Sequence, residues 1–408
     1  MQDTKLRFRN IFMSVYILAI IALLVLPMLK YSVNYVPIIL FTLPFVFVYL
    51  MQKNKSTITF LCLVIMLALL FVFSFLINAP LNINAAMNMS IILYLCFVPF
   101  LLFDYLSNTK SKWEVQLVLI GIICIYAFII IMTSRAFIDD PVIARRLAIG
   151  SADDEYINDM RMKNIGGFGF SYAVGMFIPY IAIRIVRSSG KTKALFIALF
   201  IVLFVYAFFC QYTMLLILAI AFSTVVFIIG SKSIITKTVM LFSSLVILIN
   251  LAGIFKFLGN SLPFVSLAYH FRGLYTSLST GEDTTSRILT TKRCLGLFRQ
   301  HPFFGVNMLD SYNAYIVNHG HSTYFPILAS NGIFGLGMLF VTTFYIMRSI
   351  YLKIRTNRMN VIIFIMSVVL GFLNPTYNAF AVSVSVFLLI PLIEYYEGKI
   401  KEQKYAVQ

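Results

Sequence analysis

Apolar residues occur along the chain in blocks of about 20, separated by short polar segments. A block of this length, wound as α-helix at about 1.5 Å per residue, crosses the ~30 Å hydrocarbon layer of a bilayer. The pattern therefore predicts about twelve transmembrane helices. Their expected ranges are 11–29, 35–51, 57–77, 85–106, 113–133, 164–186, 194–211, 213–230, 238–255, 321–346, 361–374 and 376–393.

Two of the predicted boundaries depend on short helix breaks. A turn at 211–213 must fold one long apolar run in two, and a turn at Asn374-Pro375 must end a short span. Proline lacks an N–H and disfavours helix in the preceding residue, which favours the second turn. The first block follows a cationic segment but is too long for a signal-peptide core, so we expect an uncleaved first span.

Two segments between the predicted spans are too long to be simple connectors. Loops longer than about 15 residues in a compact protein are usually functional or disordered. Aromatic runs at 263–265 and 269–275 and an amphipathic stretch at 284–300 argue against disorder. We therefore divide the chain into helices 1–5 (1–133), a first outer segment (134–163), helices 6–9 (164–255), a second outer segment with an amphipathic helix (256–320), helices 10–12 (321–393) and a tail (394–408).

The composition supports this division. Of the 408 residues, 61% are hydrophobic and 12% are charged. A soluble domain carries roughly 45–50% apolar and about 25% charged residues. The composition excludes a water-soluble globular protein and predicts an all-α polytopic membrane protein.

The formal charge of +17 is explained by topology. If the N-terminus lies inside, every inner segment carries Lys or Arg, whereas the four short outer loops contain only Lys30. This asymmetry is the positive-inside pattern, and it predicts that both termini are cytoplasmic. Most of the charge therefore indicates membrane orientation rather than a nucleic-acid partner.

The two outer segments nevertheless carry many cations, among them Arg145, Arg146, Arg272 and Arg287. One interpretation is a solvated loop surface in which these cations pair with neighbouring carboxylates. The other is that at least two guanidinium groups converge on an anionic ligand at headgroup depth, because their planar fork binds phosphate in a bidentate way.

All four histidines lie in the second outer segment or at its edge, at positions 270, 301, 319 and 321. His319 and His321 stand just before a predicted span, where a neutral imidazole accepts a proton near pH 7. The pair lacks a third metal ligand nearby, and the acidic run 153–155 is equally unspecific, so we expect no metal. Cysteines lie mostly inside apolar blocks, and no glycine-rich nucleotide loop is present, so we also expect no cofactor.

Two stretches carry a family resemblance. The first runs from Ser286-Arg287 to His301-Pro302-Phe303-Phe304-Gly305-Val306, and the second from His321 to Asn331-Gly332-Ile333-Phe334-Gly335-Leu336. Together they resemble the O-antigen ligase and polymerase family, the Wzy-type bacterial polysaccharide polymerases. From the residues alone, Gly332, Gly335 and Gly337 indicate close helix contact in a membrane.

The resemblance implies a GT-C-like helical fold and a bacterial cytoplasmic-membrane glycosyltransferase. It implies metal-independent, inverting transfer of an undecaprenyl-diphosphate-linked glycan to a sugar hydroxyl of a lipid-linked repeat unit. His321 would be the base and Arg287 would hold the diphosphate, with Arg145, Arg146, Arg272 and His319 as further substrate contacts. Expected partners are lipid-linked oligosaccharides, membrane lipids, a chain-length regulator and a flippase, with no nucleic acid.

Two alternatives remain open. A ligase would move the glycan to a different acceptor, although residues 211–213 lack the Ser-Arg pair of ligase members, which favours a polymerase. A flippase or transporter of lipid-linked oligosaccharide would carry ionisable residues along a path inside its spans and show two related halves. Neither feature is evident in the sequence.

Overall fold

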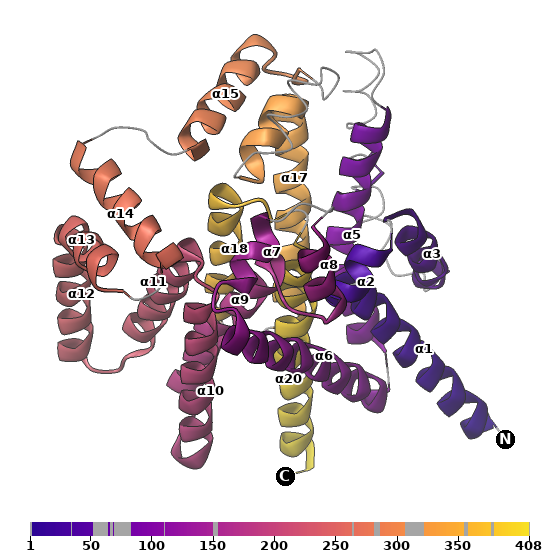
Figure 1. Cartoon of the computed structure of the whole chain (residues 1–408). Coiled ribbons are helices and arrows are strands. Elements are labelled where there is room, and N and C mark those ends of the chain that lie inside the picture. Colours follow the sequence, from indigo (N-terminus) through magenta and orange to yellow (C-terminus); the bar gives the residue numbers. More distant parts are fainter. Residues whose placement is uncertain are drawn as a thin grey trace.

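The computed structural model describes residues 2–33, 35–51, 64, 65, 68, 83–109, 111–149, 154–262, 265–280, 286–306, 322–354, 358–376 and 379–407. These residues form helices and connecting loops, and they include no β-strand (Figure 1). The protein is therefore an all-α protein over the whole of this part.

The helices follow the chain in this order: α1 (Gln2–Val25), α2 (Pro27–Ser32), α3 (Tyr35–Met51), α5 (Ile83–Asn108), α6 (Lys112–Asp139), α7 (Ile143–Ile149), α8 (Glu155–Met162), α9 (Phe168–Arg187), α10 (Gly190–Phe209), α11 (Thr213–Gly230), α12 (Ile234–Ile249), α13 (Leu251–Ser261), α14 (Val265–Thr280), α15 (Ser286–Gln300), α17 (Tyr324–Ile354), the short 3₁₀ helix η1 (Arg358–Asn360), α18 (Val361–Leu373), α19 (Phe380–Val384), the π-helical turn η2 (Ser385–Leu389) and α20 (Ile390–Val407).

Several of these helices are long and apolar enough to cross a membrane. Within the described residues they are α6, α9, α10, α11, α17 and the run Phe380–Ile400 through α19, η2 and α20. The pair α12 and α13 makes a seventh if it counts as one bent span. The chain is therefore a multi-pass membrane protein.

The predicted spans other than 57–77 fall mostly on helical residues, but only six or seven of the described helices are long and apolar enough to cross a membrane. The span 57–77 lies almost wholly outside the described residues. The turn predicted at 211–213 is confirmed, because α10 ends at Phe209 and α11 begins at Thr213. The break at Asn374 is confirmed as well, because α18 ends at Leu373. The predicted span 238–255 falls on α12 and α13, which meet at an angle of 70°.

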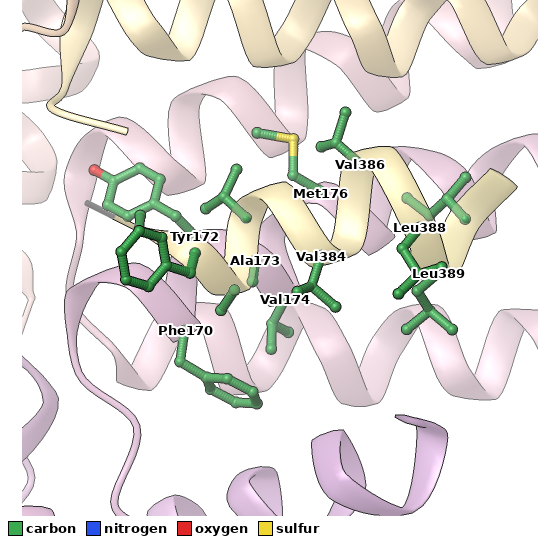
Figure 2. Packing of buried hydrophobic residues seen from close by; sticks show 14 of the residues in the cluster. Phe170, Tyr172, Ala173, Val174, Met176, Val384, Val386, Leu388 and Leu389 are labelled. Carbon is green, nitrogen blue, oxygen red and sulfur yellow. The ribbon is translucent and has the colours of Figure 1, made fainter. Parts of the chain in front are cut away.

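Helix α9 forms the centre of the fold. It packs against α10, α11 and α19, and 78% of its most apolar stretch is buried, against 17% for α10. Figure 2 shows Phe170, Val174 and Met176 of α9 among Val384 and Val386 of α19 and η2. Because α10 is apolar all round yet packs on one side only, its outer surface is suited to lipid.

Polar side chains tie the helix ends together on the side predicted to be cytoplasmic. Arg184 of α9 binds Glu394 at 3.1 Å and also Glu397, both on α20. Lys353 of α17 binds the buried carboxylate of Asp104 on α5 at 2.6 Å. These contacts join helices that are far apart in the sequence, so they fix how the central helices align.

Candidate functional site

Helix α17 is not one continuous rod, because it doubles back at Gly332. This residue has φ 63° and ψ −165°, a conformation that is essentially restricted to glycine. The rings of Tyr324 and Phe340 lie 4.9 Å apart, whereas 16 residues of unbroken helix would separate them by about 24 Å. The prediction of a single span over 321–346 is therefore corrected: a short arm (324–331) precedes a long arm (333–354).

The loop after α15 fills the point at which α17 doubles back. The N–H of Ile333 donates to the Pro302 carbonyl at 2.9 Å, and the N–H of Val306 donates to the Ala329 carbonyl at 2.9 Å. A Cβ on Gly332 would lie 2.2 Å from the Phe303 carbonyl oxygen. Gly332 is therefore required for a backbone-to-backbone contact with this loop.

Gly305, on the loop itself, is constrained in the same way. It has φ 78°, and a Cβ there would lie 2.2 Å from the Ser330 carbonyl carbon. By contrast, a Cβ on Gly337 would meet nothing within 4 Å among the described atoms. Gly305 and Gly332 thus allow the two resemblance motifs to contact each other. The sequence predicted that Gly332 contacts a neighbouring helix, whereas in the structure it contacts the loop after α15.

The start of the short arm is anchored in the core through the two residues that precede it. The Thr323 N–H donates to the Gly371 carbonyl at 2.7 Å, and its hydroxyl donates to the Asn374 carbonyl at 3.1 Å. The Ser322 hydroxyl donates to the same Gly371 carbonyl at 3.1 Å. Both side chains are buried. The chain therefore begins the short arm from a fixed position beside the end of α18.

A cavity of about 80 Å³ lies next to this anchor. The apolar part of its wall includes Tyr324, Leu339 and Phe387. Its polar lining consists of Cys96, Thr323, Thr343, Ser367, Thr376 and Ser383. A space with an apolar wall and a few hydroxyl groups is suited to a small part of an amphipathic ligand.

A cluster of three aromatic rings and one cation lies where the first predicted outer segment meets the turn before α11. The guanidinium of Arg145 lies 6.0 Å from the centre of the Tyr212 ring, and the Tyr212 hydroxyl donates to the Ala144 carbonyl at 2.6 Å. The rings of Phe168 and Tyr172, at the start of α9, pack on Tyr212 at 5.8 and 5.6 Å. Burial raises the pKa of the Tyr212 phenol well above its usual range, so it remains a hydrogen-bond donor at physiological pH.

The other predicted arginines have separate contacts. Arg146 is exposed and pairs with Asp140 at 3.1 Å. Arg272 of α14 donates to the Gly259 carbonyl at 2.7 Å and thereby joins α14 to α13. Among the contacts that the structure describes, Arg145, Arg146 and Arg272 thus have different partners and do not converge on one point.

The predicted base and the predicted diphosphate-binding arginine lie at the edges of the described part of the chain. Arg287 lies in the first turn of α15, which packs against α17, but its side chain is not described. His319 and His321 lie outside the described residues. The residues directly after His321 are the buried anchor of the short arm, which the sequence analysis did not predict. A Ser-Thr pair at the start of an apolar block was the available signal.

The acidic run considered as a metal candidate has a structural role in part. Asp154 caps α8, since its carboxylate accepts from the Ile157 N–H at 3.2 Å. Within the described ranges, no group of three or more His, Cys, Asp or Glu side chains is arranged to hold a metal ion.

Searches of the sequence against profiles of known protein families and against curated proteins returned no match. We therefore infer the function from the residues and their geometry.

Proposed function

We propose that this protein is a polysaccharide polymerase of the bacterial cytoplasmic membrane. In this proposal it transfers an undecaprenyl-diphosphate-linked glycan to a sugar hydroxyl of a lipid-linked repeat unit, of the O-antigen or capsular kind, on the outer face. The chain-length regulator and the flippase expected from the sequence would be its partners.

The main support for this proposal is a backbone contact between the two stretches that resemble the polymerase family. The stretches are separated in sequence, yet backbone hydrogen bonds join 302–306 to 329–334. Gly305 and Gly332 make this contact possible. Motif residues that merely covered a surface would not need such close backbone contact. The docking is what a site assembled from both stretches requires.

The proposed reaction needs a base and a set of cations. The acceptor hydroxyl oxygen attacks C1 of the donor glycan, the bond from C1 to the phosphate oxygen breaks, and the configuration at C1 inverts. His321 takes the hydroxyl proton, and undecaprenyl diphosphate leaves with the bonding electrons. Arg287 offsets the charge that develops on the leaving diphosphate, and Arg145 is proposed as a further substrate contact.

The role of the base requires a fixed position. Ser322 and Thr323, which directly follow His321, are buried and hydrogen-bonded to Gly371 and Asn374. A base attached to such an anchor is oriented at little further entropic cost. The cavity beside Thr323 gives a neighbouring space for part of the substrate.

The proposal includes an arrangement in the membrane. Twelve spans in a GT-C-like fold would leave both termini in the cytoplasm and the segments 134–163 and 256–320 outside. The cation distribution supports this orientation, because only Lys30 lies in the short outer loops.

Reconstitution tests the function directly. The purified protein is placed in liposomes with a lipid-linked repeat unit, a metal chelator and no nucleotide sugar. A polymerase produces a ladder of longer lipid-linked glycans. Movement of labelled repeat units across the bilayer without elongation would instead indicate a flippase. Transfer only to an added acceptor that lacks polyprenyl would indicate a ligase.

A further inference from the structure

Two cations contact the same aromatic ring beside the core. The guanidinium carbon of Arg161, on α8, lies 4.3 Å from the centre of the Tyr31 ring. The ammonium of Lys30, on α2, lies 5.3 Å from the same centre and 5.4 Å from the ring of Phe380. Figure 1 shows α2 and α8 close together in the middle of the view, and the two helices are in contact. Two positive charges are thus held near each other by aromatic rings.

The guanidinium of Arg161 has an unused donor. Its Nε is buried and has no hydrogen-bond partner, while its Nη1 donates to the Asn158 amide oxygen at 3.3 Å. A buried charged donor without an acceptor is costly, so an acceptor supplied by a ligand would stabilise Arg161 here. The chemistry of the group favours an anion that accepts from several N–H groups at once.

The neighbouring carboxylates whose contacts are described serve other groups. Asp159, on the same helix as Arg161, pairs with Lys163 at 2.6 Å. Asp140 pairs with Arg146, and Asp154 caps the start of α8. No ion pair with a carboxylate is described for Arg161. The buried Nε of Arg161 is therefore available to a ligand.

Lys30 lies about one helical turn from the wall of the candidate site's cavity. Phe380, under the Lys30 ammonium, is the first residue of α19, and Ser383 one turn later lines the cavity. Thr323, which follows the proposed base by two residues, forms part of the same wall. The contact between Lys30 and Phe380 therefore relates the pair of cations to the cavity through α19.

The position of Lys30 in the sequence gives an independent reason to examine it. It is the only cation in the four short loops predicted to lie outside, so the positive-inside pattern does not account for it. A cation that departs from this pattern and packs on two aromatic rings is expected to have a role other than setting the orientation of the chain in the membrane.

We propose that Lys30 and Arg161 bind the diphosphate group of the lipid-linked substrate beside the ring of Tyr31, which both cations contact. The inference rests on the proposed function for the identity of the lipid. Its chemical content is a phosphate site at headgroup depth, in which Arg161 supplies the bidentate fork and Lys30 a second charge. Tyr31 is the positioning residue that holds both cations.

Direct binding tests this site without requiring catalysis. The purified full-length protein in neutral phosphatidylcholine nanodiscs is titrated with undecaprenyl diphosphate that carries no sugar, and the bound lipid is measured by native mass spectrometry. Lys30→Gln and Arg161→Gln are each expected to weaken binding about tenfold or more, the usual effect of losing a charged hydrogen bond. Lys163→Gln, an exposed cation on the same segment, is the matched control and should change binding less than threefold.

Stability is followed by thermal melting. Should Arg161→Gln fail to fold, Arg161→Lys keeps the charge and the contact with Tyr31 and should still bind several-fold more weakly. Wild-type affinity in a folded variant of Arg161 would overturn the site.

Two further arms identify the source of the phosphate. Inorganic pyrophosphate should compete with the lipid, whereas nanodiscs containing phosphatidylglycerol should not. Full displacement by phosphatidylglycerol would mean a general anionic-lipid surface and would overturn the diphosphate assignment.

Failure of this site and failure of the function are distinguishable. If the wild type polymerises and both variants bind normally, only the site fails. If the wild type binds through these residues and never polymerises, only the function fails.

Discussion

At the scale of single residues, the candidate site depends on glycines whose backbone carries a positive φ. Gly332 lies in a region of φ and ψ that other residues reach only at a cost of about 1–3 kcal/mol, before any clash is counted. Gly305 has φ 78° and contacts the backbone of Ser330. The sequence revealed that these glycines matter but not why, because a glycine at a helix contact and one at a sharp reversal look alike in a single sequence.

Replacement of Gly332 by Ala tests this assignment. The added Cβ would lie 2.2 Å from the Phe303 carbonyl oxygen, so we expect a loss of at least about 2 kcal/mol in stability and a clearly lower melting temperature. Gly337→Ala is the matched control, because open space surrounds that position. It should be neutral or slightly stabilising, by up to ~1 kcal/mol, as Ala is the better helix former. Equal melting temperatures for the two variants would contradict the reversal at Gly332.

Arginine chemistry is testable at the same scale. Arg287→Lys keeps the charge but loses the planar fork, so polymerisation in the reconstituted system should fall by about tenfold or more. Arg299→Lys, at the other end of α15, should change the rate by less than about twofold. Equal tolerance at both positions would mean that α15 is only a surface element.

At the scale of elements, the sequence predicted helix boundaries better than helix directions. The turns at 211–213 and Asn374 carry local signals, polar residues in one case and a proline in the other, and both are present. The reversal at Gly332 and the 70° bend between α12 and α13 occur inside blocks that are apolar on average, although polar residues stand at both points, Ser330-Asn331 and Asn250. Hydropathy measures how apolar a stretch is, and it carries almost no information on the direction of the helix axis.

Cysteine cross-linking tests the reversal of α17. Tyr324→Cys combined with Phe340→Cys, in a variant without the native cysteines, should be joined by a short bifunctional thiol reagent, because the two native rings are 4.9 Å apart. Tyr324→Cys with Tyr351→Cys is the control pair. Residue 351 lies about 16 Å farther along the long arm than residue 340. Cross-linking of the control pair but not of the first would contradict the doubled-back arrangement.

At the scale of the whole molecule, composition alone predicted the class of fold. A chain that is 61% hydrophobic can satisfy its backbone in a bilayer only as helices or as a closed barrel, and blocks of about 20 residues favour helices. The sequence could not predict which helix is central. Helices α9 and α10 are both apolar, and only the packing distinguishes the buried one from the one with an open surface.

The orientation in the membrane is tested by labelling. Lys191→Cys, in the first turn of α10, should react only after the membrane is permeabilised, whereas Ser279→Cys on α14 should react with an impermeant maleimide in intact cells. This result follows from the cation asymmetry between the two sets of loops. Labelling of both positions from the same side would contradict the proposed topology and, with it, the placement of the site on the outer face.

The role of His321 as the base that joins lipid-linked repeat units is tested by one rate comparison. Polymer formation is measured in liposomes for the wild type, His321→Ala and His319→Ala, with folding checked by melting temperature. We expect His321→Ala to remain folded and to lose about 10²–10⁴-fold in rate, the usual contribution of general acid–base catalysis. His319→Ala should lose much less. A well-folded His321→Ala protein that polymerises at a near-normal rate would exclude His321 as the base.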